Sequence, residues 1–157
     1  VPAGNSLEEL LIEADLAAAI GMSSDNPDIQ PLIANPLDAG FDAFSSRGHY
    51  PINHLIVVRD EVLDEHPGIA VAVFNAFTES KNLYLKQLRN SEIMNPDSTD
   101  KLYKRMLDSG ADPLPYGIAP NRRVLEDLIA HATTQKIISK PMDVESVFAP
   151  TTLRLTG

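Results

Sequence analysis

A short run of contiguous aliphatic residues restricts the fold of this chain more than any other part of its sequence. Residues 55–58 read L-I-V-V, and three of the four are β-branched. β-Branched residues favour strands, and an unbroken aliphatic run is typical of a strand buried on both faces of a parallel sheet. Residues 16–22 form a second apolar run of strand length, closing at Gly21. These two runs predict a small, partly parallel sheet.

Apolar residues at helical spacing predict that most of the remaining chain is helical. Ser6 and Glu9 have the spacing of a capping box, in which each side chain accepts a hydrogen bond from the other residue's backbone amide. The apolar residues of 69–89 recur every three or four positions, which predicts the longest helix there. Further helices are expected over residues 36–44, 60–66, 98–107 and 121–137, with a last helical turn or two in 142–148. We therefore expect a helix-rich α/β fold whose sheet is flanked by helices.

Composition excludes several classes of protein and several kinds of site. A chain of 157 residues that is 43% hydrophobic can build the core of one domain, and it contains no cysteine for disulfides or thiolate chemistry. No apolar run approaches the roughly 20 residues that span a bilayer, so membrane insertion is not expected. The net charge is −9, and no basic stripe is interleaved with aromatic residues. Nucleic acid is therefore not an expected partner.

The segment that leads into the aliphatic run carries the first candidates for chemistry. His49 and His54 flank a P-I-N turn, and the entrances of strands in α/β folds often face ligand crevices. A histidine there could act as a general acid near neutral pH. The alternative is that His54 is a half-buried residue whose ring is satisfied by a backbone carbonyl. Arg47 and Arg59 lie on either side of this segment, and either guanidinium could hold an acidic ligand or pair with surface carboxylates.

A proline-rich loop carries the second group of candidates. In D-P-L-P-Y-G two prolines stiffen the backbone around Tyr116, and the polar residues Asn121 and Arg122 follow closely. Such a loop could line a pocket, or Tyr116 could cover apolar surface instead. The acidic residues of 60–65 have helical spacing and are interpreted as a solvated face, so no metal site is predicted.

Several strings, taken together, resemble one family. They are G-H-Y-P-I-N-H-L-I-V-V-R-D, then H-P-G-I-A, then D-P-L-P-Y-G-I-A-P-N-R-R-V-L-E, and finally V-F-A-P-T-T-L. In this order they resemble the C-terminal half of 4,5-dihydroxyphthalate decarboxylase-like proteins, which are related to proteins with the type II periplasmic binding-protein fold. The usual string at the first site resembles P-I-M-H, and Asn53 stands here in place of the methionine. That replacement could alter the polarity of a pocket.

The resemblance implies a two-lobed α/β protein with a ligand cleft between its lobes. Residues 1–157 would then be a single unit from the C-terminal portion of a longer chain. Within it, residues 1–50 would end the second lobe, and residues 51–157 would return to the first lobe and supply the C-terminal helices. An exposed lobe interface could also support a homo-oligomer.

The same resemblance implies non-oxidative decarboxylation of 4,5-dihydroxyphthalate, an aromatic dicarboxylate, to protocatechuate and CO2, with no cofactor. His54 and Tyr116 are the candidate catalytic residues under this hypothesis, with Tyr116 bonded to a ring hydroxyl. The candidate substrate-binding residues are Asn53, Arg59, Asn121 and Arg122. The alternative is a solute-binding protein of an ABC transporter that closes around a small organic acid or heterocycle. The enzyme would be cytoplasmic and the binding protein periplasmic; we expect the chain, which begins at Val1, to be an internal fragment.

Overall fold

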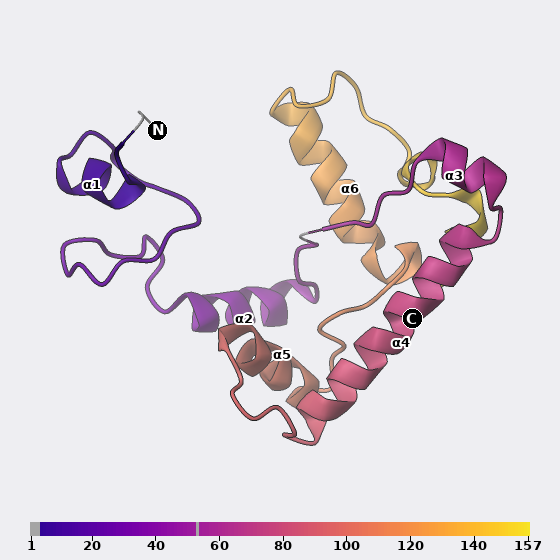
Figure 1. The fold of residues 1–157 in the computed structure, drawn as a ribbon, viewed down its shortest axis with the longest axis horizontal. Coiled ribbons are helices and arrows are strands. Elements are labelled where there is room, and N and C mark those ends of the chain that lie inside the picture. The colour runs from indigo at the N-terminus through magenta and orange to yellow at the C-terminus, as the bar shows by residue number, and fades with distance from the viewer. Residues whose placement is uncertain (1–3, 53) are drawn as a thin grey trace. The chain divides into compact units, whose positions relative to one another are not determined.

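The computed structural model describes residues 4–52 and 54–157 (Figure 1). The chain folds into two compact units, Val1–Ala39 and Gly40–Gly157. Two kinds of element occur among the described residues: the α-helices α1 (Leu7–Ile12), α2 (Pro36–Arg47), α3 (Asp60–Glu65), α4 (Ile69–Arg89), α5 (Ser98–Asp108) and α6 (Ile118–Thr134), and the 3₁₀ helices η1 (Val144–Val147) and η2 (Pro150–Thr152).

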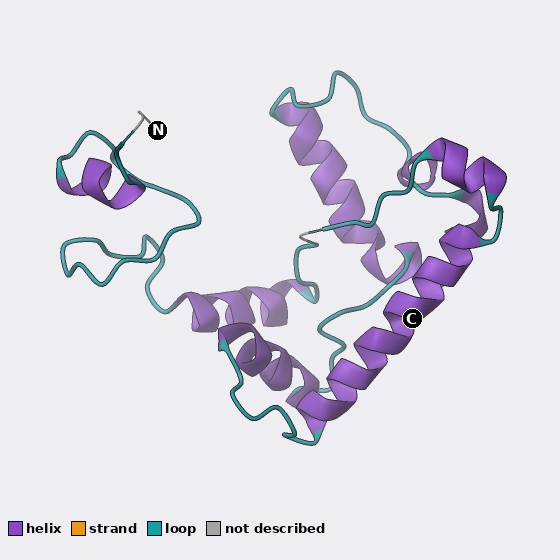
Figure 2. Ribbon diagram, in the orientation of Figure 1, coloured by secondary structure: helices purple, strands orange, loops and turns teal. Residues whose placement is uncertain are grey.

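The predicted α/β fold with its partly parallel sheet is wrong, because the structure contains no strand within residues 4–52 and 54–157 (Figure 2). Residues 55–58 form an irregular segment between α2 and α3, in which Ile56 is 60% exposed and Val57 is 90% exposed. Residues 16–22 form irregular chain with three bends. A β-branched run favours extended backbone, but a strand also needs a neighbouring strand that completes its hydrogen bonds. No other described segment offers that edge, so the fold is helical.

The helical predictions agree better with the structure. Helix α4 begins and ends where its apolar spacing predicts. The capping box of α1 is confirmed, with Glu9 N donating to Ser6 Oγ at 3.1 Å and Ser6 N donating to Glu9 Oε2 at 2.8 Å. Helix α6 begins at Ile118, three residues earlier than predicted, because Gly117 with a φ of +103° ends the preceding loop abruptly.

The hydrophobic core of the unit Gly40–Gly157 lies where α6 packs against η1. Ile118, Leu125 and Val144 are its buried centre, and partly buried side chains surround it: Ile52, Ile129, Phe148 and Leu153. Helix α4 packs against α3, α5 and η2. Met106 of α5 is fully buried.

Candidate functional site

A cleft of about 1210 Å³ lies within the unit Gly40–Gly157. Its wall comes from the end of α2 with the segment that follows it, α3, and the first half of α4. Helix α5, the loop before α6 with the first half of α6, and the region of η1 and η2 complete it. Aliphatic and aromatic side chains form much of this wall, including Phe44, Phe74, Phe77 and Phe148. Polar and charged side chains are a minority among them, as in sites that bind small organic molecules.

The last residue of α2 brings a guanidinium to the cleft, and the segment between α2 and α3 brings two imidazoles. Arg47, His49 and His54 all line it, and the exposed His54 follows the undescribed residue 53 directly. Nδ1 of His49 lies 3.1 Å from the carbonyl oxygen of Arg47, a local contact that steadies the turn at the end of α2. His54 is therefore an exposed residue in the wall of the cleft. The predicted substrate-binding residue Asn53 lies outside the described residues.

The loop before α6 holds Tyr116 in the wall of the cleft by its backbone and its ring. Tyr116 N donates to the Gly157 carbonyl at 2.9 Å, and Gly157 N donates to the Tyr116 carbonyl at 3.2 Å. The ring meets that of Phe74 edge-on, with centroids 6.3 Å apart. A Cβ added at Gly117 would overlap the carbonyl oxygen of Leu155, so the C-terminal segment approaches this loop as closely as a glycine allows.

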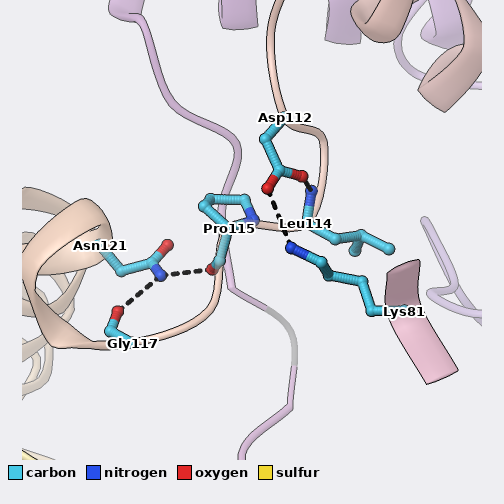
Figure 3. Close-up of polar contacts among 6 residues, drawn as sticks. All are labelled: Lys81, Asp112, Leu114, Pro115, Gly117 and Asn121. Atoms are coloured by element: carbon cyan, nitrogen blue, oxygen red, sulfur yellow. Dashed lines mark hydrogen bonds and ion pairs between the residues drawn. The ribbon is translucent and has the colours of Figure 1, made fainter. Parts of the chain in front are cut away.

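Asn121 fixes the same loop from inside α6. Its side-chain amide is buried, and Nδ2 donates to the carbonyls of Pro115 at 2.6 Å and Gly117 at 2.9 Å (Figure 3). Those two carbonyls flank Tyr116, so a single amide determines the path of the backbone on both sides of it. Asn121 also borders the cleft. Its donors, however, are both committed to the protein rather than open to a ligand.

A buried lysine, which has no signal among the sequence motifs, supports Tyr116 from α4. The Lys81 side chain is only 3% exposed, and its Nζ lies 3.0 Å from Oδ2 of Asp112 (Figure 3). The same Nζ lies 5.3 Å from the centroid of the Tyr116 ring, within the range of a cation–π contact. The other carboxylate oxygen of Asp112 accepts a hydrogen bond from Leu114 N at 2.8 Å.

Two further tyrosines line the cleft beside Tyr116. Tyr50 and Tyr103 meet edge-on, with ring centroids 6.5 Å apart. Burial raises the pKa of the Tyr103 phenol, and the neighbouring hydroxyls of Tyr50 and Tyr116 raise it further. Tyr103 therefore stays protonated at neutral pH and can donate a hydrogen bond. The sequence around Tyr103 shows no signal for this role, whereas Tyr50 lies within the string that contains both histidines.

The arginines named from the sequence lie in different surroundings. Arg59 precedes the first residue of α3, and Arg122 is exposed on α6; neither lines the cleft. Arg122 pairs with Glu145 and, at 3.5 Å, with Glu126. The Glu145 carboxylate raises the pKa of the Arg122 guanidinium, and Arg122 in turn lowers the pKa of Glu145. Arg47 is thus the arginine that the described structure brings to the cleft.

Neither a metal centre nor a membrane-spanning helix occurs in the described part of the chain. Within residues 4–52 and 54–157, no group of three or more histidine, aspartate or glutamate side chains is arranged to hold a metal ion. None of the helices in those same residues is long and apolar enough to cross a membrane.

Comparison with known proteins finds a distant relationship. No family model matches the chain. The chain is 25% identical over 161 aligned residues to 4,5-dihydroxyphthalate decarboxylase of Comamonas testosteroni, and the alignment covers 97% of this chain and 49% of that enzyme. The chain therefore spans about half the length of the curated relative it matches. At this identity, the comparison supports a loose relationship that extends along nearly the whole chain.

Proposed function

We propose that this chain forms one wall of the active site of a decarboxylase acting on a dihydroxylated aromatic dicarboxylate. The observation that carries the proposal is that His54 and Tyr116 both line one cleft, together with many aromatic and aliphatic side chains. Similarity along the chain to an enzyme named for such a reaction supports it. The aromatic and aliphatic side chains of the cleft suit a flat benzene ring, and its minority of polar groups suits the hydroxyl and carboxylate substituents.

The reaction needs a proton at the ring carbon that carries the departing carboxylate. In the proposed step, His54 in its charged form gives a proton to that carbon, the bond to the carboxylate breaks, and its electron pair restores the aromatic ring as CO2 leaves. A hydroxyl para to that carbon supplies electron density while the ring is protonated. His54 then regains a proton from water, so each turnover of the dianion consumes one proton.

The other cleft residues have binding roles in this proposal. Tyr116 bonds to a ring hydroxyl, and Arg47 at the cleft holds the carboxylate that remains on the ring. Arg59 and Arg122 lie off the cleft in the described structure, so in this proposal neither holds a carboxylate of the ligand. Asp60 also lines the cleft, and its charge opposes an anionic ligand, so the guanidinium has to outweigh it.

The test uses the natural full-length polypeptide with 4,5-dihydroxyphthalate as substrate. Protocatechuate is followed by chromatography and CO2 is measured in parallel, while calorimetric titration follows binding. We expect turnover in the parent protein, and a loss of at least about a hundredfold in kcat for His54→Ala, as is usual when a general acid is removed. His131→Ala is the matched control, because His131 is exposed on α6 and does not line the cleft.

The same experiment separates the enzyme from the solute-binding alternative. Binding of the dicarboxylate without release of CO2, at any pH between 5 and 9, would favour a binding protein and remove His54 from a catalytic role. Normal turnover by the His54→Ala protein would contradict the proposed step while leaving the enzyme assignment in place. Neither binding nor turnover would contradict both interpretations of the substrate.

A further inference from the structure

The buried Lys81 has no role in the function proposed above. An isolated buried ammonium is costly, and pairing it with a carboxylate usually recovers that cost without much gain in stability. Its Nζ is held by Asp112, whose own side chain is 41% exposed. A buried ion pair of this kind therefore adds little to the stability of the fold. The groups that the Lys81 ammonium contacts are a better guide to its role.

Two contacts of the Lys81 ammonium lead to Tyr116. One route runs through the backbone, since Asp112 joins Lys81 to Leu114 N, two residues before the tyrosine. The other route is direct, because the ammonium lies over the Tyr116 ring at 5.3 Å from its centroid. Figure 3 shows the Lys81 side chain reaching from α4 to the carboxylate of Asp112 in the loop.

Asn121 and Phe74 also hold Tyr116 and its neighbouring residues in place. Asn121 holds the carbonyls of Pro115 and Gly117, and the edge of Phe74 meets the Tyr116 ring. None of those contacts carries a charge, and none fixes the start of the loop. The Lys81 ammonium supplies a charge, and it joins Asp112, near the start of the loop, to the 21-residue helix α4.

We propose that Lys81 is a positioning residue that sets the Tyr116 ring, and with it the phenol oxygen, in the wall of the cleft. The inference rests on the proposed function only insofar as the phenol oxygen contacts substrate; the placement of the ring is a property of the protein alone. Lys81 itself does not line the cleft, so it acts through Tyr116.

The first arm of the test needs no substrate. The natural full-length polypeptide is labelled with 3-fluorotyrosine, and the Tyr116 resonance is assigned by its loss in Tyr116→Phe. We expect Lys81→Met to move or broaden this ¹⁹F resonance and Lys81→Arg to restore part of its position, because only the arginine keeps a cation over the ring. Lys86→Met is the matched control, since Lys86 is an exposed lysine of the same helix. An unmoved Tyr116 resonance in Lys81→Met overturns the proposal.

The second arm measures kinetics in two backgrounds. Lys81→Met should lower kcat/KM between about tenfold and a hundredfold when Tyr116 is present, as misplacing a binding group does. In the Tyr116→Phe background, which keeps the ring but lacks the hydroxyl, it should change kcat/KM less than about twofold, because the group that Lys81 positions is already gone. Equal losses in both backgrounds would show that Lys81 acts through general stability, and would overturn the proposal.

Two outcomes keep the inference separate from other failures. If the parent protein neither binds nor turns over the dicarboxylate, the proposed function fails, and the ¹⁹F arm alone decides whether Lys81 positions the ring. If Lys81→Met does not fold, Asp112→Asn replaces it, because the amide keeps the acceptor for Leu114 N and removes the charge that holds Lys81. A shifted Tyr116 resonance in Asp112→Asn then supports the proposal, and an unmoved one overturns it.

Discussion

Replacing Asn121 by alanine tests whether that amide holds the cleft loop or binds the ligand. The sequence suggested a substrate-binding role, whereas the structure commits both hydrogens of Nδ2 to the Pro115 and Gly117 carbonyls. Each neutral hydrogen bond contributes about 0.5–1.5 kcal/mol net, so the pair contributes about 2 kcal/mol. Alanine regains roughly 0.5 kcal/mol as the better helix former in α6. The two carbonyls left without a partner oppose that gain, so the expected net loss stays at about 2 kcal/mol.

Urea unfolding followed by circular dichroism at 222 nm measures this loss. With a typical slope of about 2 kcal/mol per molar urea, the midpoint of Asn121→Ala should fall by about 1 M. Asn121→Asp should fall further, because it puts a carboxylate oxygen against two carbonyl oxygens. Asn82→Ala, at an exposed position of α4, is the control and should stay within about 0.5 kcal/mol of the parent.

The opposite pattern would refute the hydrogen-bond argument. If Asn121→Ala unfolds with the parent's midpoint but binds the dicarboxylate much more weakly, the amide is a ligand group after all. Equal stability of the alanine and aspartate variants would also contradict it, because only the aspartate places like partial charges together.

Three further substitutions test other parts of the unit. Gly117→Ala should lower the unfolding free energy by at least about 2 kcal/mol, since it combines a φ of +103° with overlap at the Leu155 carbonyl, and calorimetry should show melting at least about 4 °C lower. The Tyr84 hydroxyl lowers the pKa of Asp100, so this carboxylate stabilises the fold above about pH 4 and ceases to do so as the pH falls through its folded pKa. Urea midpoints should therefore place Asp100→Asn below the parent at pH 7 and level with it near pH 2. Arg122→Met should leave both the melting temperature and substrate affinity unchanged, because its ion pairs are exposed; a large loss of affinity would return Arg122 to the binding site.

The helices could be predicted from the sequence because their signals are local. Periodicity, caps and prolines act within a few residues, and α4 and the capping box of α1 follow them closely. The sheet could not be predicted in this way. Its signal, the aliphatic run at residues 55–58, reports only the backbone preference of one segment, whereas a strand depends on a partner elsewhere in the chain. The described residues offer none, so the run remains irregular and largely exposed.

Some residues of the cleft could be predicted from the sequence and others could not. The strings around His54 and Tyr116 predicted candidate site residues, because they combine prolines that stiffen the backbone with side chains that can transfer a proton or donate a hydrogen bond. Both residues line one cleft in the structure. The sequence could not show which arginine lies at the cleft, because any surface arginine near such a string is a candidate. Only the fold shows that Arg122 lies among carboxylates on α6, whereas Arg47 lies at the cleft.

The helical periodicity of α4 contains one indication that is easily overlooked, the position of Lys81. The apolar face predicted for α4 includes Phe77 and Tyr84, and position 81 lies four residues after the first and three before the second, on that same face. A lysine at this position interrupts the apolar face of the helix, because lysine is rarely buried without a partner. The structure resolves the conflict by burying the side chain against Asp112, a carboxylate 31 positions along the chain. A charged residue at a core position of a helix is therefore an indication that a distant opposite charge and a fixed loop are to be found, even though the sequence does not say which loop.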